Sequence, residues 1–186
     1  MPRCFIAFPV GGEAKRELER VQDEIRRHDL KAPIKYTKPE DAHVTVEFLG
    51  EMSAPQINNI KKILAEVVKN YFVFDLELDH FDAYPSWDKP SVIVLTCQDD
   101  SGLGLAFKTE IDEELAKAGL LIPNGLIWRP HVTLGRVKSG WQRAGDYRRL
   151  PIDSSAWSVQ QVGLFASELD WNGPKYESLQ EFDLKK

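Results

Sequence analysis

His43-Val44-Thr45-Val46 comes back as His131-Val132-Thr133-Leu134, close to half the chain length further on. The settings of the two copies also match, because each follows a proline at short range, Pro39 in the first copy and Pro130 in the second. One histidine on a strand is ambiguous, whereas two in the same setting indicate a pair with a shared purpose. The repeat predicts two similar lobes, each of which contributes one strand to a common cleft.

Strand geometry predicts which side chains of each copy face this cleft. Successive side chains of a β-strand point to opposite faces, so residues two apart share a face. The side chains expected on the cleft face are those of His43, Thr45, Glu47, His131 and Thr133. Those expected to anchor the strands in the core are Val44, Val46, Phe48, Val132 and Leu134. Each imidazole then shares the cleft with a hydroxyl.

Two imidazoles and two hydroxyls in one cleft suit the cleavage of a phosphodiester. A neutral imidazole takes a proton from the attacking water and an imidazolium protonates the leaving alkoxide, and the ordinary pKa of histidine lets both forms exist near neutral pH. The hydroxyls can donate hydrogen bonds to the non-bridging oxygens, where negative charge builds up. This scheme requires no metal and no cofactor. Nothing in the residues themselves decides which histidine is the acid.

The hydrophobic pattern along the chain predicts an α+β fold. Helices are expected over residues 13–29, from the capping box at Ser53 to Val68, and over residues 101–118 with a stop at Gly119. Strands are expected over residues 3–8, 34–37, 42–49, 72–78, 91–97, 127–137, 157–166 and 176–184. The expected architecture is a single domain of residues 1–186, bilobal and pseudo-two-fold symmetric, with two mainly antiparallel sheets flanked by helices around a central cleft.

Composition limits the partners of the protein. The net charge is −5, so the surface as a whole does not attract nucleic acid, and any such contact must be local, at a chain end or a single phosphate. No window approaches the ~18 apolar residues of a membrane span, and the amino terminus shows no export signal. Cys4 and Cys97 lie in apolar, strand-like contexts and are expected to be buried reduced thiols. A cytoplasmic monomer is predicted.

Around these motifs the chain resembles the two-histidine phosphoesterase superfamily, in the branch of RNA 2′,3′-cyclic phosphodiesterases that are also called 2′-5′ RNA ligases. The paired His-x-Thr-apolar motif is the most specific part of the resemblance. The resemblance extends over nearly the whole chain, and it includes the stretches at residues 3–8, 39–50, 129–136, 164–168 and 176–184.

The resemblance implies an activity and roles for the motif residues. The activity is metal-independent hydrolysis of 2′,3′-cyclic phosphate, on RNA 3′ ends or small nucleotides, to a 2′-phosphate. By the assignment usual in the family, His43 is the proton donor to the leaving 3′ oxygen and His131 is the proton acceptor that activates water. Thr45 and Thr133 hold the phosphate.

Arg136 matches an arginine that the family often carries just after its second motif, where it contacts substrate. Strand parity favours the opposite orientation, because residues 132, 134 and 136 of a regular strand share the core face. A bulge at Gly135 would reset the alternation and turn Arg136 toward the cleft.

Other features have competing interpretations. His80, beside Asp79 and Asp82, is expected in a solvated turn rather than in a metal site, and Trp128 is expected to be structural. Trp141, near the second motif, is a candidate stacking surface. The most basic local stretch is either a solvated loop or a lid that touches the RNA backbone, and it contains Arg143, Arg148 and Arg149.

Alternative functions also remain open. One is a phosphoesterase or ligase that acts on another 2′-5′ or cyclic nucleotide phosphoester. The other is a non-catalytic RNA-end binding module, which would need the hydrogen-bond donors but not a pair of histidines.

Overall fold

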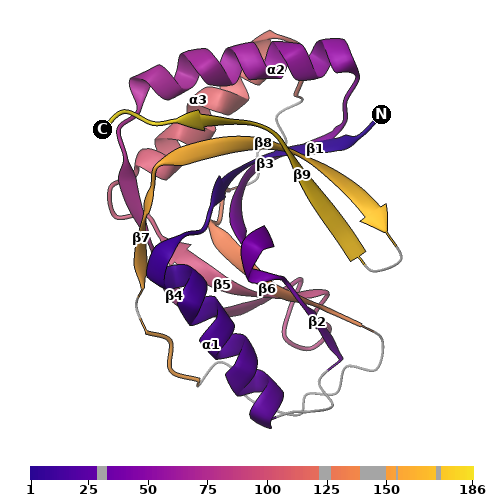
Figure 1. Ribbon diagram of the computed structural model, residues 1–186, viewed down its shortest axis with the longest axis vertical. Coiled ribbons are helices and arrows are strands. Elements are labelled where there is room, and N and C mark those ends of the chain that lie inside the picture. The colour runs from indigo at the N-terminus through magenta and orange to yellow at the C-terminus, as the bar shows by residue number, and fades with distance from the viewer. Residues whose placement is uncertain (29–32, 122–126, 139–149, 154, 171–172) are drawn as a thin grey trace.

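The computed structural model of the protein describes residues 1–28, 33–121, 127–138, 150–153, 155–170 and 173–186 (Figure 1). Its strands are β1 (Arg3–Pro9), β2 (Ile34–Tyr36), β3 (His43–Glu51), β4 (Phe74–Tyr84), β5 (Val92–Gln98), β6 (His131–Val137), β7 (Ala156–Val159), β8 (Gln161–Asp170) and β9 (Gly173–Asp183). Its helices are α1 (Gly12–His28), α2 (Ala54–Val67) and α3 (Leu103–Lys117), with short 3-10 turns at Pro39–Asp41 and Val68–Asn70. The predicted α+β class is confirmed.

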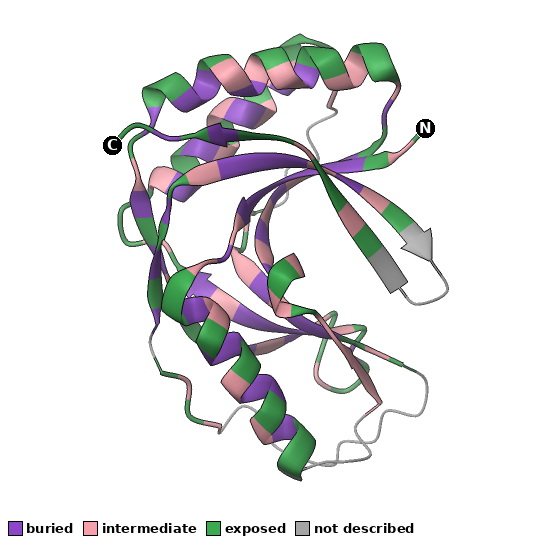
Figure 2. Ribbon diagram, in the orientation of Figure 1, coloured by how far each residue is buried: buried purple, intermediate pink, exposed green. Residues whose placement is uncertain are grey.

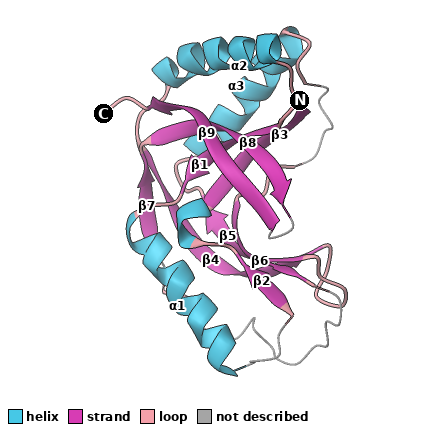
Figure 3. Cartoon of the chain, turned by 45° about the vertical axis from the view of Figure 1, so that its right-hand side comes forward, coloured by secondary structure: helices cyan, strands magenta, loops and turns pink. Residues whose placement is uncertain are grey.

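The strands form one curled antiparallel sheet in the order β7-β4-β5-β6-β3-β1-β8-β9, with β2 added beside β6. Its two halves meet where β3 pairs with β6, and Val44 and Val132 are the partners in register there. The rotated view shows how the two halves curl toward each other (Figure 3). The predicted antiparallel pairing is therefore confirmed, while the two expected sheets are joined at their centre into one.

The helices cover the outer faces of the sheet. The buried stripe of α1 packs beside β7, and α2 and α3 pack together over the other half, against β9 and β3. Figure 2 shows the buried residues of each helix on the side that faces the sheet. Ala14, Leu18, Val21 and Ile25 of α1 are at most 1% exposed, as their spacing predicted. Burial of each of the larger side chains stabilises the folded state by about 1.5–3 kcal/mol.

The helix ends follow the predicted local signals. At the start of α2 the backbone N–H of Ser53 donates to Oε1 of Gln56 at 2.9 Å, as a capping box requires. At the end of α3, Gly119 adopts a φ of +68°, a left-handed conformation that glycine accepts without strain. None of the helices in the described part of the chain is long and apolar enough to cross a membrane.

Three expectations are corrected by the fold. The strand expected over residues 157–166 is two strands, β7 and β8, which lie in different halves because the chain changes neighbours at Gln160. The strand expected to begin at residue 127 begins at His131. His80 lies within β4, at a bulge opposite β5, and not in a turn between strands. At two of these places the alternation shifts by one residue: Asp79 and His80 separate the buried Leu78 and Phe81, and Gln160 and Gln161 separate the buried Val159 and Val162.

Candidate active site

The two motifs lie side by side at the centre of the sheet. Because β3 and β6 are antiparallel and Val44 pairs with Val132, partner residues change in opposite directions from this point. Each histidine therefore lies opposite the threonine of the other motif, His43 opposite Thr133 and His131 opposite Thr45. All four line one cleft of about 770 Å³. The structure thus brings together the four residues that the repeat predicted.

Both imidazole rings are held in the same way. Nδ1 of His43 is 2.7 Å from the backbone oxygen of Asp41, and Nδ1 of His131 is 2.7 Å from the backbone oxygen of Arg129. A carbonyl oxygen only accepts hydrogen bonds, so each Nδ1 carries the hydrogen and donates it. In the neutral ring Nε2 is then left with a lone pair, and in the imidazolium it carries a second proton. Each histidine can therefore act as base or acid through Nε2.

The surroundings of the two histidines differ. The ring of His43 lies against Phe5, with ring centroids 4.9 Å apart, and meets the edge of Tyr176 at 5.2 Å. This burial lowers the pKa of His43, and the nearby charges of His131 and Arg136 lower it further, although the hydrogen bond to Asp41 acts in the other direction. The ring of His131 meets Tyr84 at 5.3 Å. The two equivalent motifs thus offer unequal environments for a proton.

A bulge in β6 turns Arg136 toward the cleft. Along β5, Val94 pairs with Thr133 and the next residue, Ile93, pairs with Gly135, so Leu134 is an extra residue in β6. The extra residue resets the alternation of side chains. Arg136 consequently lines the cleft with Thr133, instead of entering the core as simple parity requires.

The first motif strand carries a bulge at the matching position, and it corrects two expectations. Ala7 pairs with Thr45 and Ile6 with Glu47, so Val46 is the extra residue. Phe48, expected in the core, is instead 70% exposed and lines the cleft. Glu47, expected on the cleft face, points to the outer face and pairs with Lys108 of α3 at 2.5 Å. Phe48 and Arg136 thus occupy equivalent places, five residues after each histidine.

The remaining candidates lie outside the centre of the cleft. Trp128 is structural as predicted, and its indole N–H donates to the backbone oxygen of Thr45 at 3.0 Å, which braces the first motif strand. His80 contacts Asp79 and Thr96 through Nδ1. Among the described residues no group of three potential metal ligands exists. Trp141, Arg143, Arg148 and Arg149 lie outside the described residues.

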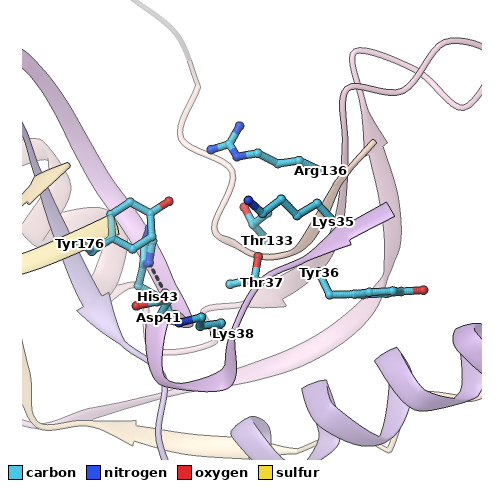
Figure 4. Close-up of a pocket in the computed structure, with 9 residues that line it drawn as sticks. All are labelled: Lys35, Tyr36, Thr37, Lys38, Asp41, His43, Thr133, Arg136 and Tyr176. Atoms are coloured by element: carbon cyan, nitrogen blue, oxygen red, sulfur yellow. Dashed lines mark hydrogen bonds between the residues drawn. The ribbon is translucent and has the colours of Figure 1, made fainter. Parts of the chain in front are cut away.

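A smaller pocket at one end of the cleft is lined partly by residues outside the two motifs. Figure 4 shows Lys35 and Arg136 extending from neighbouring strands toward the space beside Thr133, with Tyr176 across from them. Alternation in the expected strand 34–37 could have shown that the side chain of Lys35 lies on the other face of the strand from those of Ile34 and Tyr36. That β2 lies beside β6, however, is a long-range pairing that no local pattern predicts.

Solved structures share this fold from end to end. The crystal structure of TT0787 of Thermus thermophilus aligns with a TM-score of 0.81 and 25% identity, and the alignment covers 98% of each chain. LigT of E. coli, crystallised in complex with 3′-AMP, aligns with a TM-score of 0.76 and 19% identity, over 100% of this chain and 99% of that one. The overall architecture is therefore that of TT0787 and LigT.

Sequence comparison indicates a class of enzyme, the phosphoesterases. The family model described as LigT like Phosphoesterase matches residues 9–94. A protein of Aquifex aeolicus (strain VF5) named RNA 2′,3′-cyclic phosphodiesterase is 26% identical over 187 residues, which cover 98% of this chain and 97% of the relative. A Methanothermobacter thermautotrophicus protein of the same name is 24% identical, over 98% of both. By family model, curated relatives and fold, the chain is thus similar to the LigT-like phosphoesterases.

Proposed function

We propose that the protein hydrolyses 2′,3′-cyclic phosphate ends of RNA to 2′-phosphates, with His43 as proton donor and His131 as proton acceptor and without a metal ion. The observation that carries the proposal is the opposed arrangement around Val44 and Val132, in which each histidine faces the threonine of the other motif. The match to the LigT-like phosphoesterase model and the relatives named RNA 2′,3′-cyclic phosphodiesterase support the choice of substrate.

The proposed reaction balances with the groups in the cleft. Nε2 of His131 takes a proton from water as the water oxygen attacks phosphorus. The bond between phosphorus and the 3′ oxygen breaks, and Nε2 of His43 gives its proton to that oxygen. The hydroxyls of Thr45 and Thr133, with Arg136, donate to the non-bridging oxygens. The products are a 2′-phosphate and a free 3′ hydroxyl. After the reaction His43 has lost a proton and His131 has gained one.

The burial of His43 has a consequence for this assignment. Without substrate, the lowered pKa favours the neutral form of His43, which is not the form a proton donor needs. A bound phosphate carries negative charge, and an opposite charge close to an imidazole favours the imidazolium. Substrate binding thus supplies the charge that loads His43 with its proton, so the acid is formed when it is required.

The exposed ring of Phe48 suits a nucleobase. It lies on the cleft wall near Phe5, with ring centroids 6.3 Å apart. Every base has a flat π-face that can stack on such a ring, and this interaction tolerates any base. The terminal base against Phe48 and the cyclic phosphate between the histidines would together fill the cleft.

The test is incubation of the protein with short RNAs that end in a 2′,3′-cyclic phosphate, followed by identification of the product isomer. Wild type should release the 2′-phosphate in the presence of EDTA. His43→Ala and His131→Ala should each lower turnover by about 10² to 10⁴, while their circular dichroism spectra match wild type.

Several outcomes would contradict the proposal. A 3′-phosphate product would mean that the 2′ oxygen leaves, and loss of activity with EDTA would mean that a metal takes part. Near-full turnover by either alanine variant would exclude the paired mechanism. Binding of the RNA without any product at any pH would identify a binding module instead.

A further inference from the structure

The pocket beside His43 carries two neighbouring cations. Lys35 of β2 and Arg136 of β6 are direct cross-strand partners, and both line this pocket. Tyr36 lies on the outer face, where the guanidinium of Arg26 is 4.2 Å from its ring centroid, so alternation turns Lys35 to the cleft. Like charges directly opposite each other destabilise an antiparallel pair. A sheet that keeps such a pair over a cleft points to an anionic ligand.

The local sequence forces these two strands together. A Cβ atom added to Gly135 would lie 2.5 Å from Cγ2 of Ile34 and 3.0 Å from the backbone oxygen of Lys35, so only glycine lets β2 come this close. Gln22 of α1, which is 2% exposed, donates to the backbone oxygens of Thr37 and Leu134 at 2.8 and 3.1 Å. The positions of the two cations are therefore set by packed and hydrogen-bonded backbone.

The amino group of Lys35 has no ion-pair partner among the described residues. No carboxylate among the described residues forms an ion pair with Lys35 or Arg136. By contrast, Nζ of the neighbouring Lys38 is 3.9 Å from Oε1 of Glu40. A 2′,3′-cyclic phosphate carries one negative charge, and Arg136 together with one imidazolium already exceeds it. Lys35 is thus a surplus cation one strand beyond the proposed reaction centre.

We propose that Lys35 binds a second phosphate of the substrate, the one attached to the 5′ oxygen of the terminal nucleotide. This inference rests on the proposed function, since it assumes that the cyclic phosphate lies between the histidines. The second phosphate is an internucleotide phosphodiester in RNA or a 5′-phosphate in a mononucleotide. The protein therefore prefers cyclic ends that carry such a group over a bare nucleoside 2′,3′-cyclic phosphate.

Three substrates with the same terminal base test the proposal. They are a nucleoside 2′,3′-cyclic phosphate, its 5′-phosphorylated form, and a dinucleotide with a 2′,3′-cyclic phosphate end. Lys35→Met, which keeps the apolar stem, should lower kcat/KM about tenfold or more on the second and third substrates and less than twofold on the first. The slope of log kcat/KM against log salt concentration should become shallower by about 0.7 on those two substrates only.

Lys62→Met is the matched control, because it removes one positive charge from an exposed position on α2. It should leave all three rates within twofold of wild type. An equal loss on all three substrates with Lys35→Met, or no loss on any, would overturn the proposal. Loss on the 5′-phosphorylated mononucleotide but not on the dinucleotide would also overturn it, because RNA would then not place a phosphate at Lys35.

Binding provides a readout that does not depend on turnover. Wild type should bind a nucleoside 2′,5′-bisphosphate more tightly than the 2′-monophosphate, and Lys35→Met should lose most of that difference. If wild type hydrolyses none of the three substrates, the proposed function fails, and this binding comparison still decides the role of Lys35. Equal affinity of wild type for the two ligands would refute the second phosphate site.

Discussion

Replacing Lys108 with methionine tests how the first motif strand is held. The amino group of Lys108 is 2.5 Å from Oε2 of Glu47 and also pairs with Asp112, and the side chains of Lys108 and Glu47 are 12% and 11% exposed. Removal of the cation would leave two carboxylates with little access to water. Breaking a buried pair in this way costs about 3–5 kcal/mol, and we expect about 3 kcal/mol because Asp112 is 28% exposed and keeps some hydration.

Thermal and urea denaturation would measure this loss. For a chain of this length the expected decrease in Tm is about 6–12 °C. Glu47→Gln alone should cost less, since Lys108 keeps Asp112 as a partner. The double variant Lys108→Met with Glu47→Gln should be more stable than the sum of the single effects predicts, because it leaves fewer unpaired charges. Additive effects, or a loss below about 1 kcal/mol for Lys108→Met, would refute a buried ion pair at this bulge.

The same variant has an expected effect on substrate binding. Glu47 and Phe48 point to opposite sides of β3 at the bulge, so loosening Glu47 also loosens the ring that faces the cleft. Phe48→Ala should raise KM about tenfold, within the range for loss of one base–aromatic stack. Lys108→Met should raise KM in the same direction, and Phe48→Trp should not. An unchanged KM in Phe48→Ala would show that no base rests on this ring.

Three further predictions concern single residues. Tyr176→Ala exposes His43 and should raise its lowered pKa, which moves the limb of the pH–rate profile set by His43 to higher pH, whereas Tyr176→Phe keeps the ring and should leave that limb in place. His43→Gln should gain stability relative to wild type as pH falls from about 7 to about 5. The reason is that His43 of the unfolded chain binds a proton below the ordinary pKa of histidine, whereas His43 of the folded protein, whose pKa is lowered, does not. Parallel curves of unfolding free energy against pH for the two proteins would refute this. Gly135→Ala should destabilise the protein and weaken binding of phosphate ligands, since the added Cβ would lie 2.5 Å from Ile34; calorimetry and a phosphate titration would show both, and an unchanged Tm would contradict the close approach of β2.

Much of the site could be predicted because it is local. The repeated motif and the alternation of a strand were enough to place each histidine beside its threonine and each valine in the core. Helices α1 and α2 could be predicted from the spacing of apolar residues and, for α2, from the capping box at Ser53. These patterns depend on residues a few positions apart, so the amino-acid order contains them directly.

Other features of the site required the tertiary structure. Each depends on which strands become neighbours, and that is decided by packing between distant segments. The bulges at Val46 and Leu134 appear only in the pairing of β3 with β1 and of β6 with β5, and they turn Phe48 and Arg136 toward the cleft. The unequal burial of His43 comes from rings on β1 and β9.

The sequence by itself determined the chemistry of this protein, namely two imidazoles and two hydroxyls on matching strand faces. Only the tertiary structure decided how that chemistry is arranged. Antiparallel pairing placed each histidine against the threonine of the other motif, and the close approach that Gly135 permits put Lys35 next to Arg136. The reason is physical: side-chain periodicity is a property of one strand, whereas register and neighbours are set by the free energy of the whole sheet.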